Sequence, residues 1–135
     1  MTKKFIVFIF TACIALTCSV SATVSDPNIV PMSTYYRSAY SKIDISTNGT
    51  VTIKGSITGY RGTTTKTSVH LYLQKYTNKQ WSNVANWTLT TNSSSCALSK
   101  SKTVSKGKYR SKAVCTAYAG TKSEKITKYS TAITY

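Results

Sequence analysis

The sequence predicts an all-β domain, an antiparallel sandwich of about seven strands, and three observations support this prediction. Apolar and polar residues alternate over short runs after residue 22, and that part of the sequence shows no helical period. Turn residues recur at intervals of roughly ten positions, which is typical of sandwiches. Thr, Ser, Val, Ile and Tyr dominate the chain, as they do in strands and the turns between them.

The first predicted hairpin joins residues 42–46 to residues 50–59. Asn48-Gly49 between them is the strongest short hairpin signal, because both residues tolerate the positive φ of a tight turn. The segment 59–66, rich in Gly and Thr, is expected to be a loop. In the second strand, the residues expected to face the core are Val51, Ile53 and Ile57.

The second predicted hairpin joins residues 68–76, the most regular alternation in the chain, to residues 80–89. A polar turn at Thr77-Asn78-Lys79 connects these two strands. The core-facing residues of the first strand are expected to be Val69, Leu71 and Leu73. The remaining strands are expected at residues 97–104, 108–118 and 125–135.

The N-terminus has the pattern of a secretory signal. Lys3 and Lys4 precede an apolar run over residues 5–16, which is too short to span a membrane, and Val20-Ser21-Ala22 offers small residues for cleavage. We therefore expect a helical signal peptide over 1–22, a flexible arm over 23–33 and the sandwich domain over 34–135. No transmembrane segment is expected after removal of the signal peptide.

The expected location is extracellular or associated with the cell wall. The alternative is a lipoprotein, since Cys13 and Cys18 lie near the end of the apolar run. It is disfavoured because the residues before Cys18 put the large aliphatic side chain in the wrong place for lipidation. Those before Cys13 would leave a very short apolar region.

The chain is strongly basic: 18 Lys and Arg against three Asp and Glu give a net charge of +15 at pH 7. Such a surface attracts anionic polymers. The expected partners are therefore anionic cell-wall polymers or glycans. No specific nucleic-acid ligand is expected, because an exported protein rarely meets one.

Cys96 and Cys115 are the two cysteines beyond the signal segment. In an exported protein such a pair predicts a disulfide bond, with two free thiols as the alternative. A metal site is disfavoured because no His or Cys cluster accompanies the pair.

The segment Ser105-Lys106-Gly107-Lys108-Tyr109 is similar to the Asp-x-Gly-x-Tyr corner of immunoglobulin-like domains. In those domains a tyrosine near the start of the sixth strand pins the preceding turn. The chain departs from the pattern at Ser105, which replaces the acid, and at Ser111, which stands where the usual second cysteine lies. The resemblance implies an immunoglobulin- or fibronectin-like sandwich.

The chain also resembles a family of small secreted proteins of unknown function from Gram-positive (Firmicutes) bacteria. The resemblance covers residues 35–135 and implies an exported immunoglobulin-like sandwich with no known catalytic residue. The residues that carry it are Asn48-Gly49, Gly59-Tyr60, Leu73-Gln74-Lys75, Trp81-x-x-Val84-x-x-Trp87, Lys106-Gly107-x-Tyr109-Arg110, Ala117-Tyr118 and Ser123-Glu124-x-Ile126-Thr127-Lys128-Tyr129-Ser130.

We predict that the protein is not an enzyme and needs no cofactor or metal. Acid–base catalysis requires titratable groups that are placed together. The titratable residues beyond the signal segment that could do this work are scattered: they are Asp26, Asp44, His70 and Glu124.

The second hairpin is a candidate ligand-binding surface. A turn through Asn78-Lys79 would pair Tyr76 with Trp81, Tyr72 with Ala85 and His70 with Trp87 on the outer face, and Leu73 with Val84 inside. The candidate binding residues are therefore His70, Tyr72, Tyr76, Trp81 and Trp87, whose rings could stack on sugars. The alternative is structural packing of these rings, with Tyr35 and Tyr36 of the preceding segment covering the patch. A one-residue change in the register would also turn both tryptophans to the other face.

A basic strand supplies a second set of candidates. If Tyr109 faces inward, Lys108, Arg110 and Lys112 face outward and could bind polyanions. The preceding strand poses a problem, because alternation from Leu98 would turn Lys100 and Lys102 inward. Either this is an edge strand whose lysines reach solvent, which we favour, or a bulge interrupts the alternation.

Together these features predict a secreted, non-enzymatic binding domain at the bacterial cell surface. A bacteriocin-like secreted effector is one alternative, disfavoured by the absence of an amphipathic membrane-seeking segment in the sequence. A structural, wall-associated protein is the other.

Overall fold

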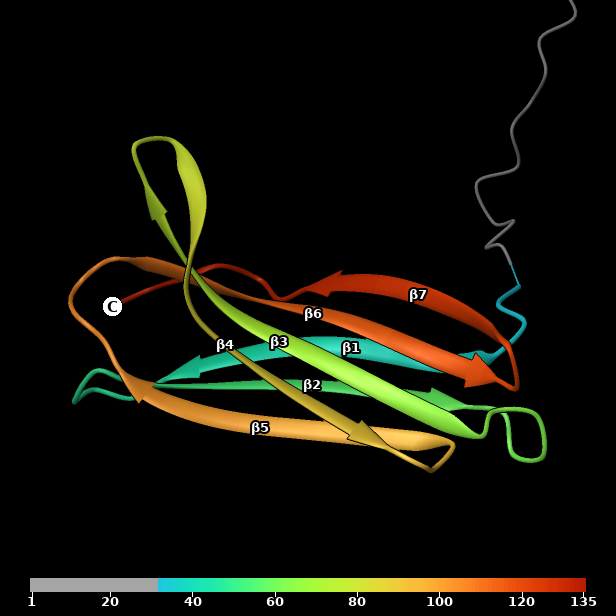
Figure 1. Ribbon diagram of the computed structural model, residues 1–135. Coiled ribbons are helices and arrows are strands. Elements are labelled where there is room, and N and C mark those ends of the chain that lie inside the picture. The colour runs from blue at the N-terminus through green and yellow to red at the C-terminus, as the bar shows by residue number, and fades with distance from the viewer. Residues whose placement is uncertain (1–31) are drawn as a thin grey trace, which may run out of the picture. The chain divides into compact units, whose positions relative to one another are not determined.

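The computed structural model describes residues 32–135. The predicted signal peptide and residues 23–31 of the predicted arm lie outside the described residues. The described chain is all-β, and its strands form two antiparallel sheets in a sandwich-like arrangement (Figure 1). The strands are β1 (Tyr36–Ile45), β2 (Thr50–Gly59), β3 (Lys66–Thr77), β4 (Gln80–Thr91), β5 (Ser95–Thr103), β6 (Lys108–Ala119), β7 (Lys122–Tyr129) and β8 (Ile133–Thr134).

One sheet has the strand order β1-β2-β5 and the other the order β4-β3-β6-β7, with β8 beside the start of β6. The predicted all-β antiparallel sandwich is thus confirmed. The predicted last strand over 125–135 is instead divided into β7 and β8. At the break, the Ser130 hydroxyl accepts the Ser111 N–H at 2.8 Å, and the Ser130 N–H donates to the Ser111 carbonyl at 2.9 Å. A side chain therefore replaces one backbone acceptor of the ladder there.

The predicted first hairpin is confirmed. Gly49 has φ +81°, and the Asn48 carboxamide oxygen accepts the Thr50 N–H at 3.0 Å. However, β1 begins at Tyr36, earlier than predicted. The alternation was hidden because Ser41 faces the core, where its hydroxyl donates to the Ser111 hydroxyl at 2.7 Å.

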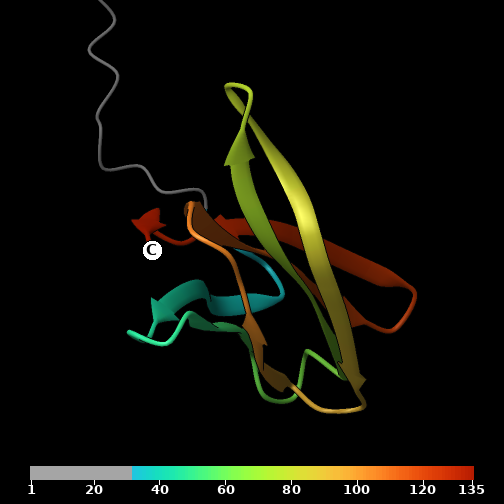
Figure 2. The same ribbon diagram turned by 90° about the vertical axis from the view of Figure 1, so that its left-hand side faces the viewer.

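The second hairpin turns through Asn78 (φ 53°) and Lys79 (φ 62°), a two-residue turn of the kind that matches strand twist. Its tip projects beyond the other strands in both views (Figures 1 and 2). The predicted turn is therefore confirmed, and it places the end of β3 and the start of β4 away from the second sheet.

The core lies between the two sheets. The inward positions predicted for β2 and β3 are confirmed, and the sheets approach closely at Gly55, where an added Cβ would lie 3.0 Å from the Ala113 Cβ. Tyr109 is also buried, and its hydroxyl donates to the Ser105 carbonyl at 2.9 Å, which is the predicted tyrosine corner. The buried apolar residues are Val51, Ile53, Ile57, Val69, Leu71, Leu73, Cys96, Leu98, Tyr109, Ala113, Cys115 and Ala117.

The predicted disulfide bond is wrong: Cys96 and Cys115 are buried, free thiols. Cys96 on β5 lies within 3.7 Å of the Leu89 carbonyl, and Cys115 on β6 lies within 3.7 Å of the Ser56 carbonyl. Each thiol therefore donates a weak hydrogen bond to a different strand of the opposite sheet. Burial raises the pKa of the Cys115 thiol to about 12, with the charge of Cys96 a smaller cause, and burial also raises the pKa of Cys96.

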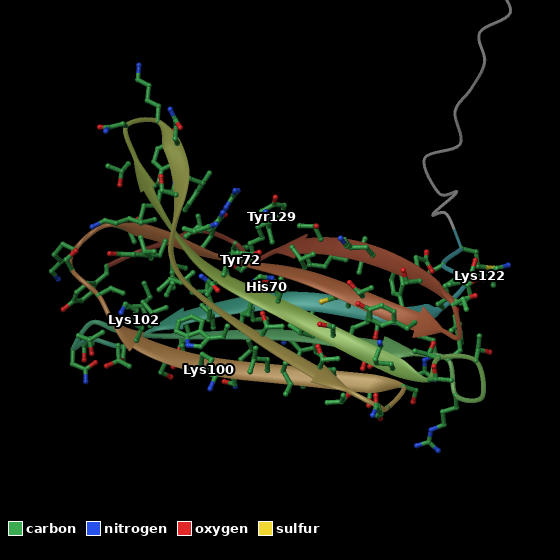
Figure 3. All side chains as sticks on the ribbon, in the orientation of Figure 1. His70, Tyr72, Lys100, Lys102, Lys122 and Tyr129 are labelled. Atoms are coloured by element: carbon green, nitrogen blue, oxygen red, sulfur yellow. The ribbon has the colours of Figure 1, made fainter. Side chains whose placement is uncertain are left out.

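Lys100 and Lys102 lie on β5, at the edge of the three-stranded sheet (Figure 3). They are paired with Ile53 and Val51 in an uninterrupted register, so no bulge separates them from Leu98. Both lysines are nevertheless exposed. The favoured interpretation as an edge strand is therefore confirmed.

Candidate functional site

The aromatic hairpin and the basic strand meet on the outer face of the five-stranded sheet that contains β3 and β6. β3 pairs with β6 so that Tyr76 lies opposite Lys108 and Tyr72 lies opposite Lys112. Paired residues of neighbouring strands share a face, so two sets that the sequence suggested separately form one surface. We call it the aromatic–basic face, and its residues are His70, Tyr72, Tyr76, Trp81, Lys108, Arg110, Lys112 and Tyr129.

Trp87 does not belong to this face, and its predicted place there is wrong. Near the turn the pairing follows the expected register, and Tyr76 lies opposite Trp81. The register then shifts between Gln74 and Leu73, leaving Val84 as the extra residue of a bulge in β4. Beyond the bulge, every side chain of β4 therefore lies on the face opposite to the predicted one.

The bulge overturns the other predicted pairs as well. The observed pairs are Leu73 with Ala85, Tyr72 with Asn86, Leu71 with Trp87 and His70 with Thr88. Trp87 is consequently on the core side, where it is half-buried and packs against the core.

Arg110 is the centre of the aromatic–basic face. Its guanidinium carbon lies 4.3 Å from the ring centre of Trp81 and 4.3 Å from that of Tyr129, so the group is stacked between two rings. Its Nε–H donates to the Gln74 side-chain oxygen at 2.8 Å. Gln74 is 6% exposed, and its amide nitrogen donates to the Asn83 side-chain oxygen at 2.8 Å. Rings and amides therefore hold the guanidinium in one orientation.

The two lysines on either side of Arg110 also lie over rings. The Lys108 ammonium is 5.6 Å from the Tyr76 ring centre, and the Lys112 ammonium is 5.3 Å from the Tyr72 ring centre. Tyr76 packs at a tilt against Trp81, with ring centres 5.1 Å apart. Each of the three cations on β6 thus lies over at least one ring.

His70 extends the face along β3. Its ring stacks on Tyr72 with centres 4.3 Å apart, and the Tyr72 hydroxyl lies 3.1 Å from His70 Nδ1. Figure 3 shows His70, Tyr72 and Tyr129 gathered over β3, β6 and β7, away from Lys100 and Lys102 on β5. Two rings of the face are open to solvent, since Tyr129 is 50% and Tyr76 41% exposed, whereas His70, Tyr72 and Trp81 are half-buried.

No Asp or Glu side chain of the described residues lies on this face. Asp44 belongs to β1 in the other sheet. Glu124 pairs with Ala117, and its carboxylate accepts the Ser33 hydroxyl at 2.8 Å and the Tyr35 N–H at 3.0 Å. The positive charge of the face is therefore uncompensated by neighbouring acids.

Tyr35 and Tyr36 do not cover the aromatic–basic face. Glu124 anchors the chain just before β1, and both tyrosines pack against the edge of the core. Of the two interpretations of the aromatic residues, structural packing holds for Trp87, whereas the rings of Tyr76 and Tyr129 remain accessible.

Sequence reasoning missed Tyr129 as a member of the face, and it missed Gln74 and Asn83, whose hydrogen bonds support Arg110. Alternation from the inward Ile126 indicates that Tyr129 faces outward, so its direction could have been inferred. Its position beside Arg110 follows from the pairing of β6 with β7 through the two-residue turn at Gly120-Thr121, where Gly120 has φ 62°. A glycine in a two-residue turn is a local hairpin signal, so this pairing could have been found from the sequence.

The comparisons find no relative: no family model, no curated protein and no solved structure matches the chain. In the described part of the chain, no group of three or more His, Cys, Asp and Glu residues could hold a metal ion. Residues 32–135 also contain no helix with the length and apolar character that crossing a membrane requires.

Proposed function

We propose that the protein is a secreted, non-enzymatic binding domain at the bacterial cell surface, and that its aromatic–basic face binds anionic polymers or glycans. The observation that carries this proposal is the guanidinium of Arg110, stacked between Trp81 and Tyr129 and hydrogen-bonded to Gln74 through Nε. Within residues 32–135 its two Nη groups have no hydrogen-bond acceptor, so they can donate to a ligand.

A guanidinium fixed in this way is suited to an oxyanion. Its two outer nitrogens form a planar fork that matches the oxygens of a phosphate or carboxylate, and charge-assisted hydrogen bonds of this kind are the strong ones. Because the rings already hold the side chain, less rotational freedom is lost when the ligand binds.

The surroundings of Arg110 favour a polymer over a single small anion. Lys108 and Lys112 stand two residues away on either side along β6, so the three cations are spaced by about 7 Å along the strand. A chain with repeated anionic groups can contact several of them at once. The exposed rings of Tyr76 and Tyr129 offer faces on which sugar or polyol units can stack.

Fold and compartment are consistent with this function. The strand orders β1-β2-β5 and β4-β3-β6-β7, with the corner at Tyr109, support an immunoglobulin- or fibronectin-like sandwich, an architecture common in cell-surface domains. The N-terminal pattern of basic, apolar and small residues supports export.

The test is binding of the full-length protein to poly(glycerol phosphate), to a polyuronic acid and to a neutral glucan over a series of salt concentrations. We expect saturable binding to at least one of the anionic polymers, weakened by salt, and weaker binding to the neutral glucan. Trp81 lies against Arg110, so its fluorescence should report ligand contact.

Two variants distinguish binding at a specific site from attraction by the net positive charge of the protein. Arg110→Ala should weaken binding about tenfold or more, since a hydrogen bond to a charged group contributes about 1.5–3 kcal/mol. Lys54→Ala removes an exposed cation from the outer face of the other sheet and should change affinity less than about twofold. Equal losses in the two variants, or no binding to either anionic polymer at low salt, would refute the proposal.

A further inference from the structure

A cavity of about 610 Å³ lies at the opposite end of the β4-β3-β6-β7 sheet from Arg110, where β3 begins. It is formed by the β2–β3 loop and the β4–β5 turn, which lie side by side in both views (Figures 1 and 2). Its volume falls within the range of small-molecule sites. Two other clefts, of about 250 Å³ beside Ile43 and about 260 Å³ beside Val84, are below that range. The residues that give the cavity its character are Arg37, Tyr60, Arg61, Ser93, Ser94 and Ser95.

Arg37 reaches this cavity because β1 has a bulge there. Tyr36 pairs with Gly59 and Ser38 with the adjacent Thr58, so Arg37 is the extra residue between them. A bulge re-aims a side chain that regular pairing would direct elsewhere, and bulges are common beside binding sites. Arg61, from the β2–β3 loop, supplies the second guanidinium. Two arginines from separate segments therefore line one cavity.

The loop backbone presents few free acceptors to a ligand. The Gly59 N–H donates to the Ser94 carbonyl at 2.6 Å, which ties the two segments together. The Thr67 hydroxyl donates to the Ser93 carbonyl at 3.0 Å, and the Thr91 hydroxyl donates to the Ser95 carbonyl at 3.2 Å. With these three carbonyl oxygens already paired, the serine contribution to the lining is mainly hydroxyl groups, which can donate as well as accept.

We infer that this cavity binds a compact phosphorylated polyol or sugar. The guanidinium pair would hold the phosphate, and the hydroxyls of Ser93–Ser95 and Tyr60 would hydrogen-bond to the hydroxyls of the ligand. The residues that line the cavity include no acid, so its charge favours an anion over a cation. Its polar lining also distinguishes it from a site for an acyl chain.

This site is independent of the proposed function of the aromatic–basic face. Arg110 pairs with Gln74 near the end of β3, whereas the cavity borders the loop that precedes Lys66, the first residue of β3. Either site can therefore be removed by substitution without altering the other.

The experiment titrates the full-length protein with glycerol phosphate, inorganic phosphate and glycerol, followed by two-dimensional NMR of the backbone amides. Glycerol phosphate should give saturable shifts in the 59–61 and 93–95 segments, and it should bind more tightly than inorganic phosphate or glycerol. Arg37→Ala and Arg61→Ala should each weaken this binding about tenfold, since each removes a charge-assisted hydrogen bond. Lys54→Ala, the control, removes an exposed cation that lies outside both sites and should leave this binding unchanged.

Both arginines are exposed, so neither substitution should prevent folding, and the amide spectrum of each variant checks this directly. Absence of saturable shifts in these two segments would overturn the inference. So would equal affinity for inorganic phosphate, or an equal loss of binding in the Lys54→Ala control. None of these outcomes bears on polymer binding at the aromatic–basic face, so failure here is distinct from failure of the proposed function.

Discussion

Replacing Arg110 by alanine tests whether its guanidinium stabilises the aromatic–basic face. The substitution removes two stacking contacts, each with a ring centre at 4.3 Å, and one hydrogen bond of 2.8 Å to Gln74. Two cation–π contacts at a partly exposed site contribute about 1–2 kcal/mol together, and the hydrogen bond contributes about 1 kcal/mol. We expect the free energy of unfolding to fall by about 2–3 kcal/mol.

Urea unfolding at equilibrium measures this loss, and two further variants identify its cause. Arg110→Lys keeps the charge but removes the planar stack and the Nε–H donor, so it should lose nearly as much stability. Lys108→Ala removes a single, longer cation–ring contact of 5.6 Å and should lose less than about 0.5 kcal/mol.

The reasoning is refuted if Arg110→Ala unfolds within about 0.5 kcal/mol of the wild-type protein, which is the usual range of surface substitutions. A double-mutant cycle of Arg110→Ala with Trp81→Leu should give a coupling energy of about 1 kcal/mol, because the two side chains are in contact. Additive effects would contradict the stacking seen between them.

Three further predictions concern the core. Gly55→Val should lower the free energy of unfolding by about 1–3 kcal/mol in urea, because a Cβ there would lie 3.0 Å from the Ala113 Cβ. A wild-type level of stability would contradict this. Tyr109→Phe should cost about 1 kcal/mol by removing the 2.9 Å hydrogen bond to the Ser105 carbonyl, measured the same way, and no loss would show that the corner is not stabilising. Because the pKa of Cys115 rises from 9.0 to about 12 on folding, the stability linked to its proton is complete below pH 9 and lost as pH rises toward 12. The free energy of unfolding should therefore fall more steeply over this pH range in the wild-type protein than in Cys115→Ala. The same pH dependence in both proteins would show that the Cys115 proton is not responsible.

Much of the fold could be predicted from the sequence because its signals are local. The Asn48-Gly49 turn, the alternation in β3 and the turn through Asn78 and Lys79 each depend on a few neighbouring residues. The start of β1 could not be predicted in this way. Ser41 faces the core there, and only its hydrogen bond to Ser111 on a distant strand makes this burial acceptable.

The candidate site could be predicted in part. The outward direction of Arg110 followed from alternation, as did that of Tyr72 and Tyr76. The face occupied by Trp87 did not follow, because one bulge residue, Val84, reverses the alternation of β4 beyond it. The disulfide prediction failed because the number of cysteines does not say which groups the two thiols contact. In the structure each thiol lies against a backbone carbonyl of the opposite sheet.

By itself, the sequence determined the all-β class, the basic surface, two hairpins and the outward cations of β6, since each of these depends on composition or on residues close in the chain. Only the tertiary structure decided that Trp81 of β4 and Tyr129 of β7 enclose Arg110 of β6. It also brought Arg37 and Arg61 to one cavity. The physical reason is that strand pairing and bulges set which distant side chains become neighbours, and both are determined by the packing of the whole sandwich.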